Sequence, residues 1–484
     1  MTAVAPSRIP RVVAGRPCAS RGEARRRWTL RSRRVVTPRG EVDGAVVVSS
    51  EGRIESVTEG TISTEAPETV DVGELAVLPG GVDSHVHLNE PGRTEWEGFV
   101  AGTRAAAAGG VTTLVDMPLN SEPTTVDVAA FAAKLEAAEG HRRRGHLLAD
   151  VAFWGGLVPR SAPRLEALWR QGVAGFKAFM ADSGVDSFPP VERTDLLPAM
   201  RSLAELGAPL LVHAEVVTTA PPPAGRVADP QSYATWLAAR PPRFEVDAVR
   251  SLLELVEQTG CRVHVVHVAA ADVVPMIREA KASGLPVTAE TCPHYLFFDA
   301  ENVPDGDPRF KCAPPIRGRR HREALWAALL DGTLDLVASD HSPAPPSMKT
   351  GSLLSAWGGI LSLEVARIAL WTEARRRGAT LSDLARWTSE APARLAGLPE
   401  RGAIVPGAAA DLVVFDPDAP WRVRDAALHH RQPGSAYDGS ELVGRVEATY
   451  LGGRSVWPPG EARRPGEMAE LSAGEPAGRE TLES

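Results

Sequence analysis

The sequence has few cysteines and no long apolar run. Its 484 residues include four cysteines, Cys18, Cys261, Cys292 and Cys312, and no CxxC pair. Such sparse cysteines form no disulfide framework, and they indicate reduced thiols in a cytoplasmic protein. No apolar stretch reaches the length of about 18 residues that a membrane-spanning helix needs. We therefore expect no segment that crosses a membrane.

The sequence also lacks an excess of positive charge. Lys and Arg number 53 against 61 for Asp and Glu, which gives a net charge of −8. Such a chain gains little from phosphate attraction, so nucleic acid is not an expected partner. With 43% hydrophobic and 24% charged residues, the composition is that of a globular protein. The length suits one barrel-sized domain with a smaller second domain.

The two ends of the chain show no apolar periodicity. Residues 1–27 are rich in Arg, contain Glu23 as their single acidic residue and lack the apolar h-region of a secretory signal. Their composition also fits an organelle transit peptide, but we expect a disordered extension. Residues 458–484 are rich in Pro, Gly and Glu and are expected to form a disordered tail.

Short β-rich runs follow the first extension and precede the tail. Residues 45–48 and 53–57 flank a Ser-Glu-Gly turn, which is typical of a hairpin. A similar run occupies residues 411–415. We expect residues 28–79 and 400–457 to pair into one small β-sandwich-like domain.

Residues 80–399 alternate between strand-like and helical segments. The strand-like runs begin near Val82, Val111, His146, Val173, Pro209, Cys261, Pro286 and Thr333. Helical stretches lie between them, such as Glu97–Ala108 and Glu245–Gln258, and each ends close to a Gly, as helices prefer. The pattern predicts an α/β fold, a (β/α)8 TIM barrel. A doubly wound open sheet is the alternative, although no G-x-G-x-x-G follows an early strand.

Two histidines lie at the end of the first barrel strand. His85 and His87 are two residues apart, a spacing that places both side chains on one face of a strand. Barrel active sites lie at the C-terminal ends of the strands. Two imidazoles at this point suggest a metal, although an HxH pair alone is weak support.

Other predicted strands also end on possible ligands. His213, His267 and Asp340 close the fifth, sixth and eighth strands. Histidine and carboxylate ligands suit Zn²⁺ and its first-row neighbours. His264 and His341 are alternative ligands, but His264 occupies the strand face opposite to His267, which favours His267.

The fourth strand contains a lysine, Lys177, within an apolar run. A buried lysine must lose its charge, find an anion or extend to solvent. Burial and nearby divalent cations both lower the pKa of an amine. A neutral amine can add CO₂ to become a carbamate, and this anion can bridge two metal ions.

These side chains together resemble a known metal site. The ligand pattern is similar to that of the amidohydrolase superfamily, and within it to the cyclic amidohydrolases, in His85, His87, Lys177, His213, His267 and Asp340. The resemblance covers about residues 28–457. It implies the (β/α)8 barrel, the small β domain and hydrolysis of a cyclic amide. It further implies two divalent ions, zinc with cobalt, manganese or iron as alternatives, a carboxylated Lys177 and a homotetramer.

The branch of the family is indicated by neighbouring residues. Dihydroorotase-like sequences carry an Arg where this chain has Asn89, and hydantoinase-like sequences carry a Tyr where it has Asp182. The runs at residues 89–98, 176–189 and 311–317 resemble allantoinases. This implies hydrolysis of allantoin to allantoate, a step of purine catabolism. A hydantoinase or dihydropyrimidinase, or a non-catalytic relative of the same fold, is the alternative.

The resemblance also implies individual roles. One metal would be held by His85, His87 and Asp340, the other by His213 and His267, with carboxylated Lys177 between them. A hydroxide held by both metals would attack the amide, and Asp340 would carry the proton to the leaving nitrogen.

Three other residues are expected to contact the substrate, and two are interpreted as structural. We expect substrate contacts from Asn89, Ala313 and Trp357. Cys292 and His294 are interpreted as a buried strand residue and a satisfied structural histidine.

Overall fold

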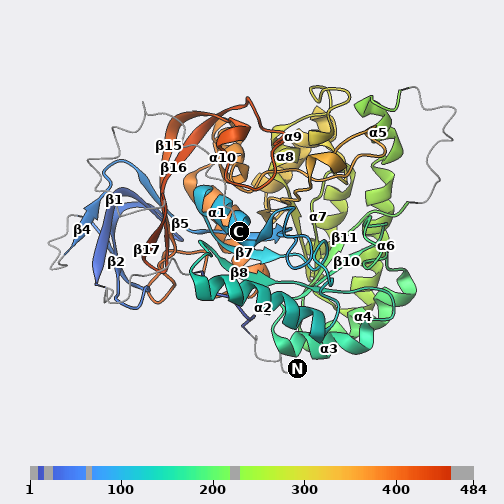
Figure 1. Cartoon of the computed structure of the whole chain (residues 1–484), viewed down its shortest axis with the longest axis horizontal. Coiled ribbons are helices and arrows are strands. Elements are labelled where there is room, and N and C mark those ends of the chain that lie inside the picture. Colours follow the sequence, from blue (N-terminus) through green and yellow to red (C-terminus); the bar gives the residue numbers. More distant parts are fainter. Residues whose placement is uncertain (1–8, 16–25, 61–67, 218–228, 459–484) are drawn as a thin grey trace.

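The computed structural model describes residues 9–15, 26–60, 68–217 and 229–458. Figure 1 shows a barrel enclosed by helices on one side of the molecule and a curved β-sheet on the other. The blue strands from the start of the chain lie beside the red strands from its end, so both ends contribute to the sheet. The architecture is therefore the TIM barrel with a β-rich domain that the sequence predicts.

Short parallel strands form the barrel wall. In the described part of the chain these are β6 (Gly81–Val86), β7 (Val111–Asp116), β8 (Asp150–Phe153), β10 (Phe176–Phe179), β11 (Leu210–His213), β12 (Val263–Val265), β13 (Val287–Thr291) and β14 (Leu336–Val337). The short β9 (Gly155–Gly156) follows β8 after Trp154 and pairs with β10. The ring closes where Val86 bridges His341 in parallel. Each strand corresponds to one predicted run, although the third begins at Asp150 instead of near His146.

Helices connect the strands and pack outside them. They are α1 (Gly98–Ala108), α2 (Val128–Arg144), α3 (Ala162–Gln171), α4 (Arg193–Leu206), α5 (Tyr233–Ala239), α6 (Arg243–Thr259), α7 (Val274–Ala282), α8 (Pro293–Phe297), α9 (Arg319–Leu330), α10 (Ala366–Arg376), α11 (Leu381–Ala385) and α12 (Ala391–Leu395). A π-helical turn at Arg386–Glu390 joins α11 to α12. Gly260 ends α6 with φ +68°, a left-handed conformation that glycine adopts without strain. The predicted helices at 97–108 and 245–258 are confirmed to within two residues.

One sheet contains strands from both ends of the chain. Its strands are β1 (Trp28–Thr37), β2 (Gly40–Val48), β3 (Ile54–Glu59), β4 (Thr69–Asp71), β5 (Ala76–Pro79), β15 (Leu412–Arg422), β16 (Glu441–Leu451) and β17 (Arg454–Trp457). Their order is β17-β16-β15-β5-β1-β2-β3, and β4 also pairs with β1. The two ends meet where β15 runs antiparallel to β5, with Leu412 opposite Pro79. Because Gly80 alone separates β5 from β6, this pairing holds the sheet directly against the first barrel strand.

The expectation of a disordered extension over residues 1–27 is wrong for residues 9–15. Val13 is fully buried and forms an antiparallel bridge with Val151 of β8. The amide of Gly15 donates to the Asp150 carboxylate, with 2.6 Å between N and Oδ1. The reason is that β8 is an edge strand of its three-stranded section, and buried backbone groups require partners. The predicted tail falls almost entirely outside the described residues.

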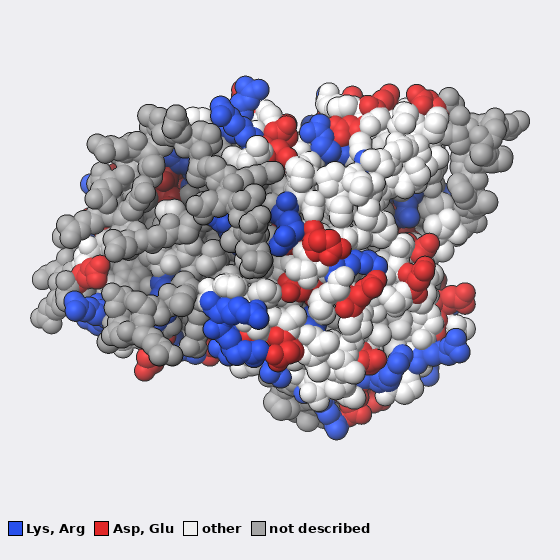
Figure 2. Space-filling view, viewed as in Figure 1, with Lys and Arg blue, Asp and Glu red and all other residues white. Residues whose placement is uncertain are grey.

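On the part of the surface in Figure 2 that is not grey, basic and acidic side chains are interspersed. Arg193 of α4 and Glu254 of α6, for example, form an ion pair of 3.0 Å. Exposed pairs of this kind each contribute little to stability. Among the described residues, no helix combines the length and the apolar character required to cross a membrane.

Candidate metal centre and active site

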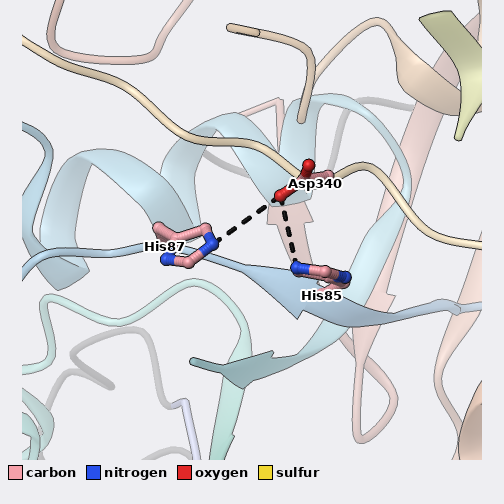
Figure 3. Close-up of side chains that lie close together, drawn as sticks. All are labelled: His85, His87 and Asp340. Atoms are coloured by element: carbon pink, nitrogen blue, oxygen red, sulfur yellow. Dashed lines mark ion pairs between the residues drawn. The ribbon is translucent and has the colours of Figure 1, made fainter. Parts of the chain in front are cut away.

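Three predicted ligands meet at the C-terminal ends of the first and last barrel strands. His85 lies near the end of β6, His87 follows it, and Asp340 follows β14. Oδ1 of Asp340 is 3.2 Å from Nε2 of His85 and 3.6 Å from Nε2 of His87. Figure 3 shows both imidazoles directed at this carboxylate. The three groups can coordinate a single ion together.

A second pair of imidazoles lies at the ends of two neighbouring barrel strands. His213 ends β11 and His267 follows β12. Their Nδ1 and Nε2 atoms are 3.0 Å apart, and both side chains are buried. The centroid of the His85 ring is 5.5 Å from that of the His267 ring, so the two groups of ligands adjoin.

Lys177 lies close to these histidines. Its side chain on β10 is fully buried, and Nζ has no hydrogen-bond partner within the described residues. Burial lowers the pKa of Lys177 to about 8, although the charge of Asp340 acts in the opposite direction. A buried amine of this kind is neutral more often than a surface lysine and can act as a nucleophile. The orphaned Nζ is consistent with a bound or covalently attached group.

The electrostatics favour neutral imidazoles. Burial, together with the charge of Lys177, holds the pKa of His85 and of His267 well below its usual value. Burial also lowers the pKa of His213. Neutral imidazole is the form that binds metals. The donor set therefore fits divalent first-row ions.

A set of polar side chains orients the rings, and none of them is among the residues that the sequence predicts for the site. Nδ1 of His85 is 2.6 Å from Oε1 of Glu290. Nε2 of His213 is 3.1 Å from Oε2 of Glu215. Asn120 supplies a third contact, with 3.3 Å between its Nδ2 and Nδ1 of His87. In each histidine the contact uses the ring nitrogen that points away from the proposed metal site. Hydrogen bonds of this kind fix the orientation of histidines that bind metals. Glu215 alone has a signal in the sequence, because it follows the predicted ligand His213 by two residues.

The two alternative ligands lie elsewhere. His264 lines a separate cavity of about 370 Å³, and its ring nitrogens contact Thr288 and Glu290 at 2.8 and 3.0 Å. Nδ1 of His341 accepts from the backbone amides of Ser362 and Leu363 at 3.1 and 3.3 Å. Both ring nitrogens of His264 are occupied by structural contacts, whereas Nε2 of His341 has no hydrogen-bond partner within the described residues.

The predicted metal ligands, except Lys177, line a cavity of about 360 Å³. Ala313 and Trp357, both predicted to contact substrate, lie on its wall. Asn89 does not: its side chain is buried, and its Nδ2 is 3.4 Å from the carbonyl oxygen of Pro343. Asn89 has φ +62°, a left-handed conformation that asparagine adopts more readily than most residues. The prediction that Asn89 contacts substrate is therefore not supported.

Cys292 and His294 lie next to the site, and their nitrogen and sulfur atoms approach Asp340 within 4.8 Å. Burial raises the pKa of the Cys292 thiol well above its usual value, which fits the interpretation as an inert buried residue. His294 differs from expectation: neither ring nitrogen has a partner in the described structure. Burial lowers the pKa of His294 to about 4.

The comparison with known proteins agrees with this geometry. The profile of the amidohydrolase family matches residues 76–456. The chain belongs to the amidohydrolase family. An allantoinase from Streptomyces avermitilis is 46% identical over 441 residues, which cover 90% of this chain and 96% of the relative. An allantoinase from Arabidopsis thaliana is 44% identical over 454 residues, with 90% and 88% covered.

Solved structures of this family have the same fold. The L-hydantoinase (dihydropyrimidinase) from Arthrobacter aurescens superposes with a TM-score of 0.83 at 29% identity, over 89% of this chain and 96% of that chain. The dihydropyrimidinase from Brevibacillus agri gives a TM-score of 0.77 at 28% identity, over 89% and 94%. The barrel with its β-rich domain is thus the common architecture of these amidohydrolases.

Proposed function

We propose that this protein opens the hydantoin ring of allantoin by hydrolysis of the cyclic amide bond, which yields allantoate. The observation that carries the proposal is the 46% identity to an allantoinase over 90% of this chain. The proposal is supported by His85, His87 and Asp340, which can together hold a metal ion and line a cavity large enough for a small ring. The metal ligands are common to many amidohydrolases, so the cluster supports the reaction class and the relatives support the substrate.

We assign two divalent metal ions to the centre, with zinc as the first candidate and cobalt, manganese or iron as alternatives. His85, His87 and Asp340 would hold one ion, and His213 and His267 the other. Bound there, the ions would polarise the scissile carbonyl and lower the pKa of a water molecule towards neutrality. Elemental analysis of the purified protein tests this assignment, and a metal content near zero in active protein would contradict it.

Lys177 supplies the missing anion in this proposal. Its neutral amine adds to the carbon of CO₂ and loses a proton, which leaves a carbamate (N6-carboxylysine) with one negative charge. That charge lies close to the predicted histidine ligands, where a protonated lysine would repel cations. Intact-protein mass spectrometry under native conditions should detect the added CO₂.

Asp340 is the proposed proton carrier. Its carboxylate would accept the proton of the attacking water and deliver it to the leaving ring nitrogen. With φ +45°, Asp340 is held in a strained left-handed conformation, which is common for functional residues. Its side chain is 14% exposed, so it contacts the cavity while the histidines remain buried.

A hydantoinase-type specificity is the second candidate, because the solved structures cited above are hydantoinases and dihydropyrimidinases. Steady-state kinetics of metal-loaded protein on allantoin, hydantoin, dihydrouracil and dihydroorotate separates the two. We expect allantoin to exceed the others in kcat/KM by at least about 10-fold, which requires about 1.4 kcal/mol of differential transition-state binding. Equal or better turnover of hydantoin or dihydrouracil would move the assignment to a hydantoinase. The absence of turnover on all four would favour a non-catalytic relative.

We further propose that the protein is a cytoplasmic homotetramer. The cytoplasmic assignment is supported by free, buried thiols at Cys261, Cys292 and Cys312, while Cys18 lies outside the described residues. The tetramer follows the resemblance to cyclic amidohydrolases. Light scattering coupled to gel filtration tests it, and a monomeric mass would overturn it.

A further inference from the structure

A partly unpaired arginine lies on the wall of the catalytic cavity. Arg240 follows α5, and its side chain, 18% exposed, lines the cavity together with Trp236 and the metal-type histidines. We propose that the Arg240 guanidinium binds the open-chain ureido group of the substrate and thereby sets the preference for a ureido-bearing ring. This inference rests on the proposed function and names the specificity residue within it.

The guanidinium has hydrogen-bond donors to spare. Arginine carries five N–H donors in a planar fork. Nη1 of Arg240 donates to Oε2 of Glu215, and within the described residues no side-chain or backbone acceptor pairs with its Nε or Nη2. A urea carbonyl oxygen has two lone pairs and can accept two parallel N–H groups from one such fork. Because Arg240 lines the cavity, its unused donors are accessible to a bound ring.

The guanidinium is also held in place. Its central carbon lies 5.4 Å from the ring centroid of Trp236, within the range of a cation–π contact. The fully buried Glu215 contacts Arg240 with the same oxygen that lies 3.1 Å from Nε2 of His213. The Glu215 carboxylate thus fixes both Arg240 and the proposed metal ligand His213. A substrate arm held by Arg240 is therefore positioned relative to the reacting centre.

Lys311, also a basic residue on this wall, already uses its ammonium group in hydrogen bonds to the backbone. Nζ of Lys311 donates to the carbonyl oxygens of Leu354 and Ala356, the first at 3.2 Å. Burial lowers the pKa of Lys311 to about 8, and Arg240 contributes to this shift. Lys311 therefore stabilises the loop that carries Trp357, whereas Arg240 keeps free donors. With Asn89 absent from the wall, Arg240 is the stronger candidate for the ureido arm.

The test compares substrates with and without the arm. Arg240→Lys keeps a cation for Glu215 but removes the planar fork, and Arg240→Gln removes the charge. The matched control is Arg250→Gln. Arg250 is an exposed residue of α6 that pairs with Asp247. We measure kcat and KM for allantoin and hydantoin, together with metal content by elemental analysis.

We expect Arg240→Lys to retain its metals and its kcat/KM for hydantoin within about two-fold. Its kcat/KM for allantoin should fall at least about 10-fold, mainly through KM. Arg250→Gln should match the wild type. An unchanged ratio of allantoin to hydantoin kcat/KM in both Arg240 variants overturns the inference. Parallel loss of metal and of both activities also overturns it, since Arg240 would then act only through Glu215 and His213.

A binding measurement separates this inference from the proposed function. Isothermal titration with allantoate, the ring-opened product with two ureido groups, is compared with N-carbamoylglycine, the ring-opened product of hydantoin, which has one. Arg240→Lys should weaken allantoate at least about 10-fold relative to wild type and leave N-carbamoylglycine within about two-fold. Equal affinity of wild type and variant for allantoate overturns the inference. If the wild type binds allantoate in this manner yet does not hydrolyse allantoin, the proposed function fails and the ureido site stands.

Discussion

Glu290 and His85 form a buried hydrogen bond of 2.6 Å between Oε1 and Nδ1. The glutamate side chain is fully buried and that of His85 is 2% exposed. The other oxygen of Glu290 is 3.0 Å from Nε2 of His264, so the carboxylate is fixed on both sides. This arrangement leaves Nε2 of His85 directed at Asp340.

Replacing Glu290 should weaken metal binding. Glu290→Gln keeps the size of the side chain but loses the negative charge that orients His85, and loss of such an outer partner typically lowers metal affinity by about 10–100-fold. Metal content after dialysis against graded chelator measures the effect. Glu279→Gln, an exposed carboxylate of α7, serves as the control. Chelator resistance equal to the wild type would show that Glu290 does not orient the ligand.

Lys177→Ala should abolish activity and lower metal content, because the anion proposed to bridge the two ions is lost. A short carboxylic acid such as propionate should partly restore turnover by occupying the space left by the side chain. The same acid should not activate the wild type. Full activity of the variant without added acid would contradict a carbamate at Lys177.

Asp340→Asn should stop turnover while at least one metal remains bound. Asparagine can still coordinate weakly but cannot carry a proton, and general acid–base catalysis contributes about 10²–10⁴-fold. The rate on allantoin and the metal content are measured on the same preparation. More than about a tenth of the wild-type rate would exclude the proton-carrier role.

Asn89→Arg should destabilise the fold as well as reduce allantoin turnover. Asn89 is 1% exposed and has φ +62°, so arginine would bury an unpaired cation in a conformation that it rarely adopts. We expect a loss of about 2–4 kcal/mol, measured by urea unfolding. Unchanged stability with turnover of dihydroorotate would instead place residue 89 at the substrate.

His321 should make the protein less stable in acid. Burial lowers the pKa of His321 to about 4, and its Nδ1 accepts from the Ala271 amide at 3.0 Å, which requires an unprotonated nitrogen. Between about pH 4 and pH 6.5 the unfolded chain binds the proton more readily, so stability falls as pH falls through that window. Allowing for partial solvent screening, we expect the fall from pH 7 to pH 5 to be about 1 kcal/mol smaller in His321→Gln. Identical urea midpoint shifts in both proteins would refute this.

The sequence by itself determined the barrel, and it predicted six site residues on or just after its strands. The alternation of strand and helix is local, and Gly260 at the end of α6 is a local signal too. His85 and His87 share a face because side chains alternate along a strand. Parallel strands end at the same rim of a barrel, so His213, His267 and Asp340 were expected near them.

Tertiary structure decided which polar groups support that centre. Glu290 reaches His85 across 205 residues of sequence, a contact that depends on barrel closure and strand register. Arg240 reaches the cavity from a helix end, where no strand periodicity applies. Asn89 is buried against the Pro343 carbonyl and does not line the cavity, and Val13 is held because β8 has an open edge. Local patterns predict which residues share a face of one element, but contacts between distant elements depend on how those elements pack.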